Sequence, residues 1–417
     1  MSSRLIVVFL LASILTACAS PVQPALPSPT SMPPSPIPTT PVSSPSPLPP
    51  SPTPLPPSPT PTEIPAATTD LPQLALGAGH TCVLTVEDRL FCWGHDTFGQ
   101  LGAAMDSIDA VSGKPVEVTA LSGNVRQIAT GAYHTCALTL SGEVKCWGRN
   151  DNGAIGSQDG DSTEPVNVTG LQSRVVMIAS NNSGNHSCAL VEDGSVKCWG
   201  WNYAGQLGDG TMEDSPQAVD VAGLPEGITS IAVGGSTSYA LTAEGEVWAW
   251  GAGQNGQGAT GKLENSLVPA KMDGLHEVVA LAPGASHICA LTRAGAVLCW
   301  GGGDGSDASL AIPSTVKGLE SGVAQVTAGS GFTCVRMLTG EVKCWGDNWF
   351  QQLGSPVGDY SVELISVELP EPPLSITSGS VHTCALLPSG SIFCWGDFSS
   401  GQFGDGSIKW NGAGNPE

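Results

Sequence analysis

Basic side chains and catalytic signatures are both scarce in this sequence. Lysine and arginine number 15 against 37 aspartates and glutamates, which gives a formal net charge of −22. Because nucleic-acid binding depends on cationic side chains against phosphate, this balance disfavours a nucleic-acid partner. The motifs Gly-x-Ser-x-Gly, His-Glu-x-x-His and Gly-x-x-x-x-Gly-Lys-Ser/Thr are absent. The sequence therefore predicts no enzyme, no cofactor and no metal, and its abundant glycine is assigned to tight turns.

Long apolar runs are also missing after the first residues, so we expect no transmembrane helix. Residues 1–17 have the pattern of a secretory leader, in which Arg4 precedes the apolar run Leu5–Leu15. Leu15-Thr16-Ala17-Cys18 resembles the lipobox of bacterial lipoproteins, which implies cleavage before Cys18 and lipidation of that cysteine. Ordinary secretion, with Cys18 left free or removed, is the alternative.

Residues 18–62 form a low-complexity segment. Ala19–Thr62 holds 19 of the 34 prolines, interleaved with serine and threonine and without charge. This composition favours extended polyproline II and cannot build a core. We therefore expect a disordered stalk that is anchored at Cys18 and ends where the composition changes, at residue 63.

Residues 63–417 carry one fifteen-residue pattern seven times, most clearly as HTCALTLSGEVKCWG at His134–Gly148. A fixed period of 45 to 54 residues between the Trp-Gly pairs indicates one supersecondary unit per repeat, stacked on its neighbours. The seven copies end at Gly94, Gly148, Gly200, Gly251, Gly301, Gly346 and Gly396.

Each copy reads as a β-hairpin that brings two cysteines together. If Thr139 lies opposite Glu143, Cys136 lies opposite Cys146 within disulfide range. The fourth copy has lost both cysteines, with Tyr239 and Ala249 in their places, as a bonded pair predicts. A zinc site is the disfavoured alternative because the spacing lacks close pairs. The expected disulfides are Cys82-Cys92, Cys136-Cys146, Cys188-Cys198, Cys289-Cys299, Cys334-Cys344 and Cys384-Cys394, and they place the body in an oxidising, extracytoplasmic compartment.

Two further short strands accompany each hairpin. In the second copy, Pro115–Leu121 and Val125–Thr130 precede the hairpin and are β-prone. Four antiparallel strands repeated radially are the unit of a propeller. The sequence thus predicts an all-β fold, a seven-bladed β-propeller of four-stranded antiparallel blades. Pro65–Leu71 aligns with Pro115–Leu121, so we expect residues 65–70 to close the last blade and remove its open edge.

These repeats resemble the regulator of chromosome condensation family. The matching residues include His134-Thr-Cys-Ala-Leu138, Gly142-Glu-Val144, Trp147-Gly148 and the connection Gly200–Gly210. The resemblance covers about residues 65–410 and implies a seven-bladed propeller. The family includes nucleotide exchange factors for a small GTPase, which do not fit the leader and the disulfides. It also includes a secreted inhibitor of β-lactamase, which fits the compartment.

Five of the seven histidines recur at one place in the repeat, and Ser238 and Phe332 are assigned to that place in the fourth and sixth copies. A metal-binding ring is one interpretation. The favoured one is structural, namely a hydrogen bond that closes the turn between the first two strands of each blade. The five are His80, His134, His186, His287 and His382.

Several aromatic residues fall in the connection just after Trp-Gly, outside the repeat pattern. Strand alternation places all these connections on one face of the ring, where a cluster of aromatics can mark a protein or glycan site. Packing within the loops is the alternative. The candidate binding residues are Phe98, Trp201, Tyr203, Trp349, Phe350 and Phe398.

The sequence therefore predicts a monomeric bacterial lipoprotein, displayed outside the cytoplasm and touching the membrane only through Cys18. Its expected function is non-enzymatic binding of a protein or glycan through the loop face. The alternatives are an enzyme inhibitor on the same fold and a polysaccharide-acting propeller enzyme. Such an enzyme would need a carboxylate pair or a metal at one mouth of the ring.

Overall fold

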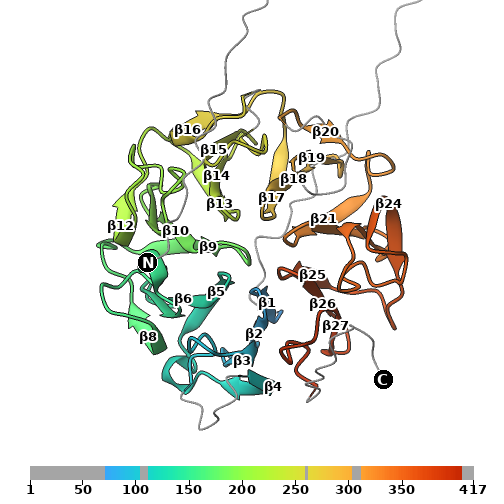
Figure 1. Cartoon of the computed structure of the whole chain (residues 1–417), viewed down its shortest axis with the longest axis horizontal. Helices are drawn as coiled ribbons and strands as arrows, with labels where there is room; N and C mark the ends of the chain where they lie inside the picture. The colour runs from blue at the N-terminus through green and yellow to red at the C-terminus, as the bar shows by residue number, and fades with distance from the viewer. Residues whose placement is uncertain (1–70, 104–110, 259–261, 303–310, 406–417) are drawn as a thin grey trace, which may run out of the picture. The chain divides into compact units, whose positions relative to one another are not determined.

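A computed structural model describes residues 71–103, 111–258, 262–302 and 311–405 of the chain. Within these residues seven small antiparallel sheets follow one another around a common axis, each contacting the next, and the first strand of the chain lies beside the seventh sheet (Figure 1). The predicted seven-bladed β-propeller is confirmed. The predictions for residues 1–70, namely the leader, lipidation of Cys18 and the stalk, concern residues outside the described ranges.

Each blade begins with a short strand next to the axis. The inner strands of neighbouring blades contact each other around the ring. These inner strands are β1 (Gln73–Leu76), β5 (Val125–Thr130), β9 (Val175–Ser180), β13 (Ile228–Val233), β17 (Val278–Pro283), β21 (Val323–Ala328) and β25 (Ser375–Ser378).

The predicted hairpin supplies the two middle strands of every blade. The second strand is almost wholly buried in each blade, as a strand sandwiched between two neighbouring blades must be. The hairpins are β2 (His80–Leu84) with β3 (Leu90–His95), β6 (His134–Thr139) with β7 (Val144–Gly148), β10 (His186–Val191) with β11 (Val196–Gly200), β14 (Thr237–Thr242) with β15 (Val247–Gly251), β18 (His287–Thr292) with β19 (Val297–Gly301), β22 (Phe332–Met337) with β23 (Val342–Asp347), and β26 (His382–Leu386) with β27 (Ile392–Gly396).

The outermost strand of each of the first six blades follows the Trp-Gly connection. It pairs with the hairpin through a register shift near the Trp-Gly pair in five of the six blades. The strands are β4 (Val111–Glu117), β8 (Ser162–Asn167), β12 (Ser215–Asp220), β16 (Ser266–Lys271), β20 (Ser314–Thr315) and β24 (Tyr360–Val367).

Two details of the strand prediction change. The strand expected at Pro115–Leu121 ends at Glu117, and Thr119–Leu121 forms the 3-10 helix η1, which turns the chain into the next blade and buries Leu121. A second 3-10 helix, η2, spans Asp151–Gly153. The described part of the seventh blade has three strands, and the closing strand expected at residues 65–70 lies outside the described residues.

All six predicted disulfides are present. In each hairpin the two cysteines are directly opposed, as Cys136 and Cys146 are, with Cα atoms 4.1 Å apart. The other five pairs have the same separation. Closing so short a loop stabilises a fold by about 2–3 kcal/mol in the chain-entropy model, and six such bonds indicate an oxidising compartment.

Neighbouring blades are joined by a recurring three-part hydrogen-bond unit. The backbone carbonyl of Gln100 in blade 1 accepts bonds from the Thr135 hydroxyl and from the indole Nε1–H of Trp147, both in blade 2, at 2.9 Å each. Since the Thr135 proton is used there, its oxygen accepts from the Nε2–H of His80 at 3.0 Å. We expected the histidine side chain to close a turn in its own blade. That expectation is wrong, because the side chain bonds to the next blade.

The same histidine bond recurs at five of the seven interfaces between blades. It joins His134 to Ser187, His186 to Ser238, His287 to Thr333 and His382 to Thr81, at 2.8 to 3.1 Å. The assignment of Ser238 to the histidine position was wrong: Thr237 holds that position, opposite Gly251, as His134 lies opposite Gly148.

The interface between blades 4 and 5 replaces this unit with a different one. Thr237 stands in place of the histidine. In blade 5, Ile288 occupies the position at which other blades have a hydroxyl residue, and its side chain cannot accept a hydrogen bond. The buried hydroxyl of Tyr239 donates instead to the carbonyl of Gln257, at 3.3 Å. That carbonyl also accepts the indole of Trp300. The absence of the disulfide in the fourth blade thus goes together with the replacement of the histidine and of its hydroxyl partner at this interface.

The axis of the ring is crossed by a segment of the third blade. Between Ala129 and His134 the second blade has four residues, whereas the third has six between Ala179 and His186. In this longer turn, the side-chain amide of Asn182 donates to the carbonyls of Ala328 and Ser378, in blades 6 and 7. We call Asn181–Gly184 the axial strap. Next to it lies a cavity of about 290 Å³ lined by all seven inner strands.

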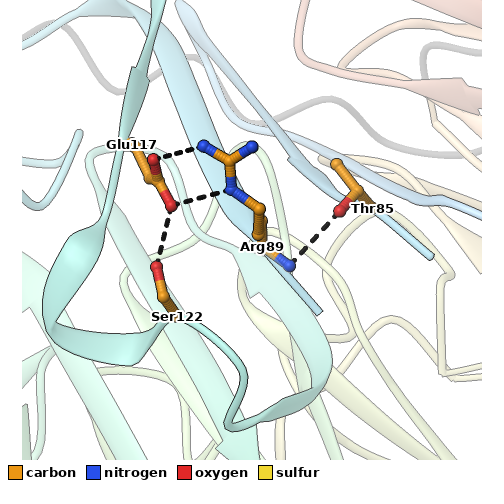
Figure 2. Close-up of polar contacts among 4 residues, drawn as sticks. All are labelled: Thr85, Arg89, Glu117 and Ser122. Carbon is orange, nitrogen blue, oxygen red and sulfur yellow. Dashed lines mark hydrogen bonds and ion pairs between the residues drawn. The ribbon is translucent and has the colours of Figure 1, made fainter. Parts of the chain in front are cut away.

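Beside the hairpin turn of the first blade, an ion pair fixes the outer strand of that blade to its hairpin. Figure 2 shows the Glu117 carboxylate accepting from the Arg89 guanidinium, at 2.6 and 3.0 Å, and from the Ser122 hydroxyl, at 2.8 Å. These bonds lower the pKa of Glu117 to about 2. Because Arg89 is half exposed, the pair adds little to stability.

Among the described residues, no helix has both the length and the apolar character needed to cross a membrane.

Candidate binding face

The connections after Trp-Gly and the turns between the first and second strands lie on one face of the ring, which we call the loop face. Backbone hydrogen bonds tie the two sets of loops together, for example from Arg149 N to Tyr133 O at 2.9 Å and from Trp201 N to Asn185 O at 3.0 Å. The six predicted binding residues are all on these loops. The structure separates them into three groups.

The first group surrounds Phe98 on blades 1 and 2. The Phe98 ring meets Tyr133 edge to face, with centroids 5.5 Å apart. The guanidinium of Arg149 lies over both rings, at 4.8 Å from Phe98 and 5.6 Å from Tyr133, and forms an ion pair with Asp151. His95 contacts both rings as well. Most of the stacking capacity of Phe98 is therefore used within the protein.

The second group is the pair Trp201 and Tyr203 on blade 3. Their ring centroids are 4.4 Å apart, and the Tyr203 hydroxyl bonds Ser236 of the next blade at 3.3 Å. Tyr203 is 45% exposed, whereas Trp201 is partly buried. Tyr203 is therefore the more exposed ring of the pair.

The third group lies on blades 6 and 7 and is the most exposed. Trp349 is 69% exposed and Phe350 50% exposed. Phe398 packs on Phe403, with ring centroids 5.7 Å apart. Phe350, Phe398 and Phe403 join Phe393 around a cavity of about 290 Å³ between the two blades. The six predicted residues thus include rings that pack within the loops, such as Phe98, and rings that are exposed to solvent, such as Trp349.

Sequence reasoning missed four residues that complete these groups. Tyr133 lies in the turn before a hairpin, so a search limited to the connections after Trp-Gly did not include it. Arg149 directly follows Trp147-Gly148, but it was passed over because the search considered aromatics alone. Phe393 and Phe403 occupy repeat positions that carry Lys145 and Leu101 elsewhere, so an alignment of the repeats could have found them.

The chain matches the family model of the regulator of chromosome condensation (RCC1) repeat along most of the propeller. One form of the model matches residues 73–100, 125–154, 179–206, 228–257, 323–352 and 374–402, and a second form matches 87–138, 141–190, 193–241 and 244–291. This chain belongs to the RCC1-repeat family.

Two relatives are about a third identical to the chain over the residues that align. The ultraviolet-B receptor UVR8 of Arabidopsis thaliana is 34% identical over 205 residues, or 48% of this chain and 45% of the receptor. The E3 ubiquitin-protein ligase HERC2 of Homo sapiens is 32% identical over 293 residues, or 66% of this chain and 6% of the ligase. The chain spans less than half the length of both relatives.

Solved structures agree with the fold. Human WBSCR16 superposes with a TM-score of 0.64 at 22% identity, covering 73% of this chain and 84% of that one. Yeast RCC1 (Prp20), solved bound to Kap60, has a TM-score of 0.64 at 20% identity, covering 74% and 78%. At such identities the likeness concerns the fold alone.

The histidines of this RCC1-repeat chain do not form a metal site among the described residues, where no group of three or more potential metal ligands occurs. Each ring lies at an interface between blades, and four of the five pack on a glycine: His80, His134, His287 and His382. A Cβ built on Gly131 would lie 1.9 Å from the His134 ring, so only glycine fits there. Burial lowers the pKa of His134 to about 4 and those of His80, His186 and His382 to about 3. These four imidazoles are therefore uncharged near neutral pH and serve as structural hydrogen-bonding groups.

Proposed function

We propose that this RCC1-repeat propeller is a non-enzymatic protein-binding module, held outside the cytoplasm by a lipid at Cys18 and acting as a monomer. The observation that carries the proposal is the exposure of large aromatic side chains on the loop face, led by Trp349 at 69%. Exposed aromatics on a rigid scaffold are typical of protein interaction sites.

Three further observations support it. Six disulfides fit an extracytoplasmic location. The hydrogen bonds that join the blades hold the loops in place before any partner arrives, which lowers the entropic cost of binding. Among proteins of the same fold, yeast RCC1 (Prp20) has been solved bound to Kap60, which supports a protein partner for this chain.

The test is a pull-down from the envelope and medium of the source organism with the full chain. We expect a bound protein that is lost from a Trp201→Ala/Trp349→Ala variant. The matched control is Leu140→Ala/Leu338→Ala, because these leucines are 49% and 75% exposed in the hairpin turns of the opposite face. A partner that the control loses and the aromatic variant keeps would contradict the loop face as the site.

A further inference from the structure

A pocket of about 410 Å³ lies beside the hairpin turn of blade 2, at the end of the strands remote from the loop face. All of its lining residues fall within the continuously described stretch 111–258. They come from the turn Ser141–Val144, from Asn167 and Val168 at the end of β8, and from the linker Leu171–Arg174 that leads into blade 3. The volume is within the roughly 300–1,000 Å³ typical of small-molecule sites.

The pocket is present because blade 2 lacks the group of side chains that occupies the same place in blade 1. There the Arg89 guanidinium binds the Glu117 carboxylate, which also accepts from the Ser122 hydroxyl (Figure 2). The corresponding positions of blade 2 are Glu143, Asn167 and Gln172. Within the stretch 111–258 these three side chains do not hydrogen-bond to one another, and the space that the ion pair fills in blade 1 is left as a pocket.

The rim of the pocket combines donors and acceptors of hydrogen bonds. The Glu143 carboxylate accepts from the neighbouring Ser141 hydroxyl at 3.3 Å, and a carboxylate has capacity for further bonds. The Arg174 guanidinium forms an ion pair with Glu192 at 3.5 Å, in which both side chains are exposed. The Gln172 amide has no hydrogen-bond partner in the described part of the chain. Since the lining contains one carboxylate and one guanidinium, it suits a ligand without net charge.

The buried part of the lining is apolar and firmly held. Val144 and Val168 are buried and Leu171 is partly buried. The backbone N–H of Val168 donates to the carbonyl of Val144 at 3.0 Å, and that of Val175 donates to the carbonyl of Gly142 at 3.0 Å. These bonds join the linker and the outer strand to the hairpin. The pocket is therefore formed before a ligand arrives, which lowers the cost of binding.

We propose that this pocket binds a neutral polyhydroxylated ligand, as a free sugar or as the terminal sugar of a glycan. A sugar ring has apolar C–H faces and hydroxyls at its edge that both donate and accept, which matches an apolar floor with a polar rim. The hydroxyls donate to Glu143, accept from Arg174 and do either with the Gln172 amide. The pocket lies away from the loop face, so this inference goes beyond the proposed protein-binding function.

Saturation-transfer difference NMR of the full chain with D-glucose, D-galactose, D-mannose and N-acetyl-D-glucosamine tests the proposal. We expect at least one sugar to bind, and to bind about tenfold more weakly to a Glu143→Ala/Gln172→Ala variant, as loss of a hydrogen bond to a charged group predicts. The matched control, Glu87→Ala/Asn124→Ala, removes a carboxylate and an amide from exposed positions at the same corner of blade 1. It should bind within about twofold of the unaltered protein.

A second variant fills the pocket without removing polar groups. Glu143→Arg/Asn167→Glu/Gln172→Ser rebuilds in blade 2 the ion pair that Figure 2 shows in blade 1. We expect this variant to lose sugar binding and to keep its urea unfolding midpoint, because an exposed ion pair adds little to stability. Sugar binding that persists in a folded triple variant overturns the inference.

A glycan array probed with the full chain separates the two sources of the ligand. Sugars that bind in solution without array signals assign a free sugar, whereas array signals that share one terminal sugar assign a glycan, and both results support the pocket. Silence in both experiments, or binding of glycine or glutamate in place of the sugars, overturns it. The Trp201→Ala/Trp349→Ala variant should keep sugar binding, and its loss there would place the sugar on the loop face and overturn the inference. Sugar binding is measured without the pull-down partner, so the proposed function and this inference stand or fall separately.

Discussion

The imidazole Nε2 of His382 lies 3.1 Å from the hydroxyl of Thr81, across 301 residues of sequence. The Thr81 hydroxyl in turn donates to the carbonyl of Gln402, which also accepts the indole of Trp93. The last blade is thus joined to the first by the same unit that joins blade 1 to blade 2. Ring closure between the described blades 7 and 1 is therefore built into the repeat itself.

Replacing either partner of this bond should destabilise the whole ring. We expect His382→Ala and Thr81→Val each to lower the unfolding free energy by about 1–3 kcal/mol, because each leaves a buried polar group without its partner. The double variant should cost less than the sum of the two, by about 0.5–3 kcal/mol. Urea unfolding of the four proteins measures this coupling.

The control is His276→Ala, an exposed histidine outside the hydrogen-bonded ring. It should unfold within about 0.5 kcal/mol of the unaltered protein, as surface substitutions usually do. Strict additivity of the His382 and Thr81 effects would show that the bond does not hold the two blades together.

The repeat made the fold predictable, and its regularity also limited the prediction. Seven copies fixed the blade number, the hairpins and the register that joins each cysteine pair, because all of these depend on local spacing. The partner of His80 could not be found in this way, since Thr135 is 55 residues distant and belongs to another copy. Contacts between repeats require the geometry of stacking, which a single repeat does not contain.

Acid should destabilise the propeller through its buried histidines. Burial lowers the pKa of His80, His186 and His382 to about 3 and that of His134 to about 4, whereas an unfolded histidine titrates near about 6.5. Between these values the unfolded chain binds more protons, so stability is complete above about pH 6.5 and falls as the pH drops towards about 3–4.

Thermal unfolding at several pH values between about 7.5 and 4 checks this acid response. A variant that replaces one buried histidine with a neutral donor, His134→Gln, should be less stable at neutral pH but show a shallower decline on acidification. A parallel decline in both proteins would assign the acid sensitivity to the carboxylates.

The fourth interface offers a rescue experiment. Tyr239→Phe removes a hydroxyl donor to the Gln257 carbonyl and should lower the unfolding free energy by about 1 kcal/mol. Ile288→Thr restores a hydroxyl at the repeat position that serves this carbonyl elsewhere, as Thr135 does for Gln100. The double variant should therefore be more stable than the sum of the two single changes predicts.

Tyr203→Phe is the matched control for this rescue, since its hydroxyl bonds Ser236 at the exposed surface. It should change stability little, and Ile288→Thr should not interact with it. Equal effects of Ile288→Thr in the Tyr239→Phe and Tyr203→Phe backgrounds would contradict the compensation.

The axial strap is only four residues long, but we expect it to contribute strongly to the stability of the ring. The Asn182 amide reaches blades 6 and 7 at 3.3 and 3.0 Å, and Asn181 donates to Pro283 of blade 5 at 2.9 Å. Asn182→Ala should lower the unfolding free energy by about 2–3 kcal/mol, because two buried carbonyls lose their donor. Asn167→Ala, at the exposed end of β8, is the control for removal of an asparagine side chain.

The candidate site was less predictable than the fold. The sequence placed Trp201 and Trp349 on one face, but it treated the six aromatics as equivalent. The structure shows that Phe98 is covered by Tyr133 and Arg149, whereas Trp349 is open to solvent. Exposure depends on which neighbouring loop reaches each ring, and these loops vary in length from blade to blade.

Truncation locates the strand that completes the seventh blade. In the described residues Leu71 precedes His80 by nine positions, as Val125 precedes His134. By this register Pro61-Thr-Glu-Ile64 also corresponds to Pro115-Val-Glu-Val118 of the first blade, and this segment is an alternative to residues 65–70 as the closing strand. We therefore expect a chain that begins at Pro65 to melt below one that begins at Pro57, because an unpaired edge and an unfilled apolar position both cost stability. If those two chains melt together and only a chain beginning at Leu71 melts lower, residues 65–70 provide the closing strand. If all three melt together, the hydrogen bonds between blades 7 and 1 suffice to close the ring.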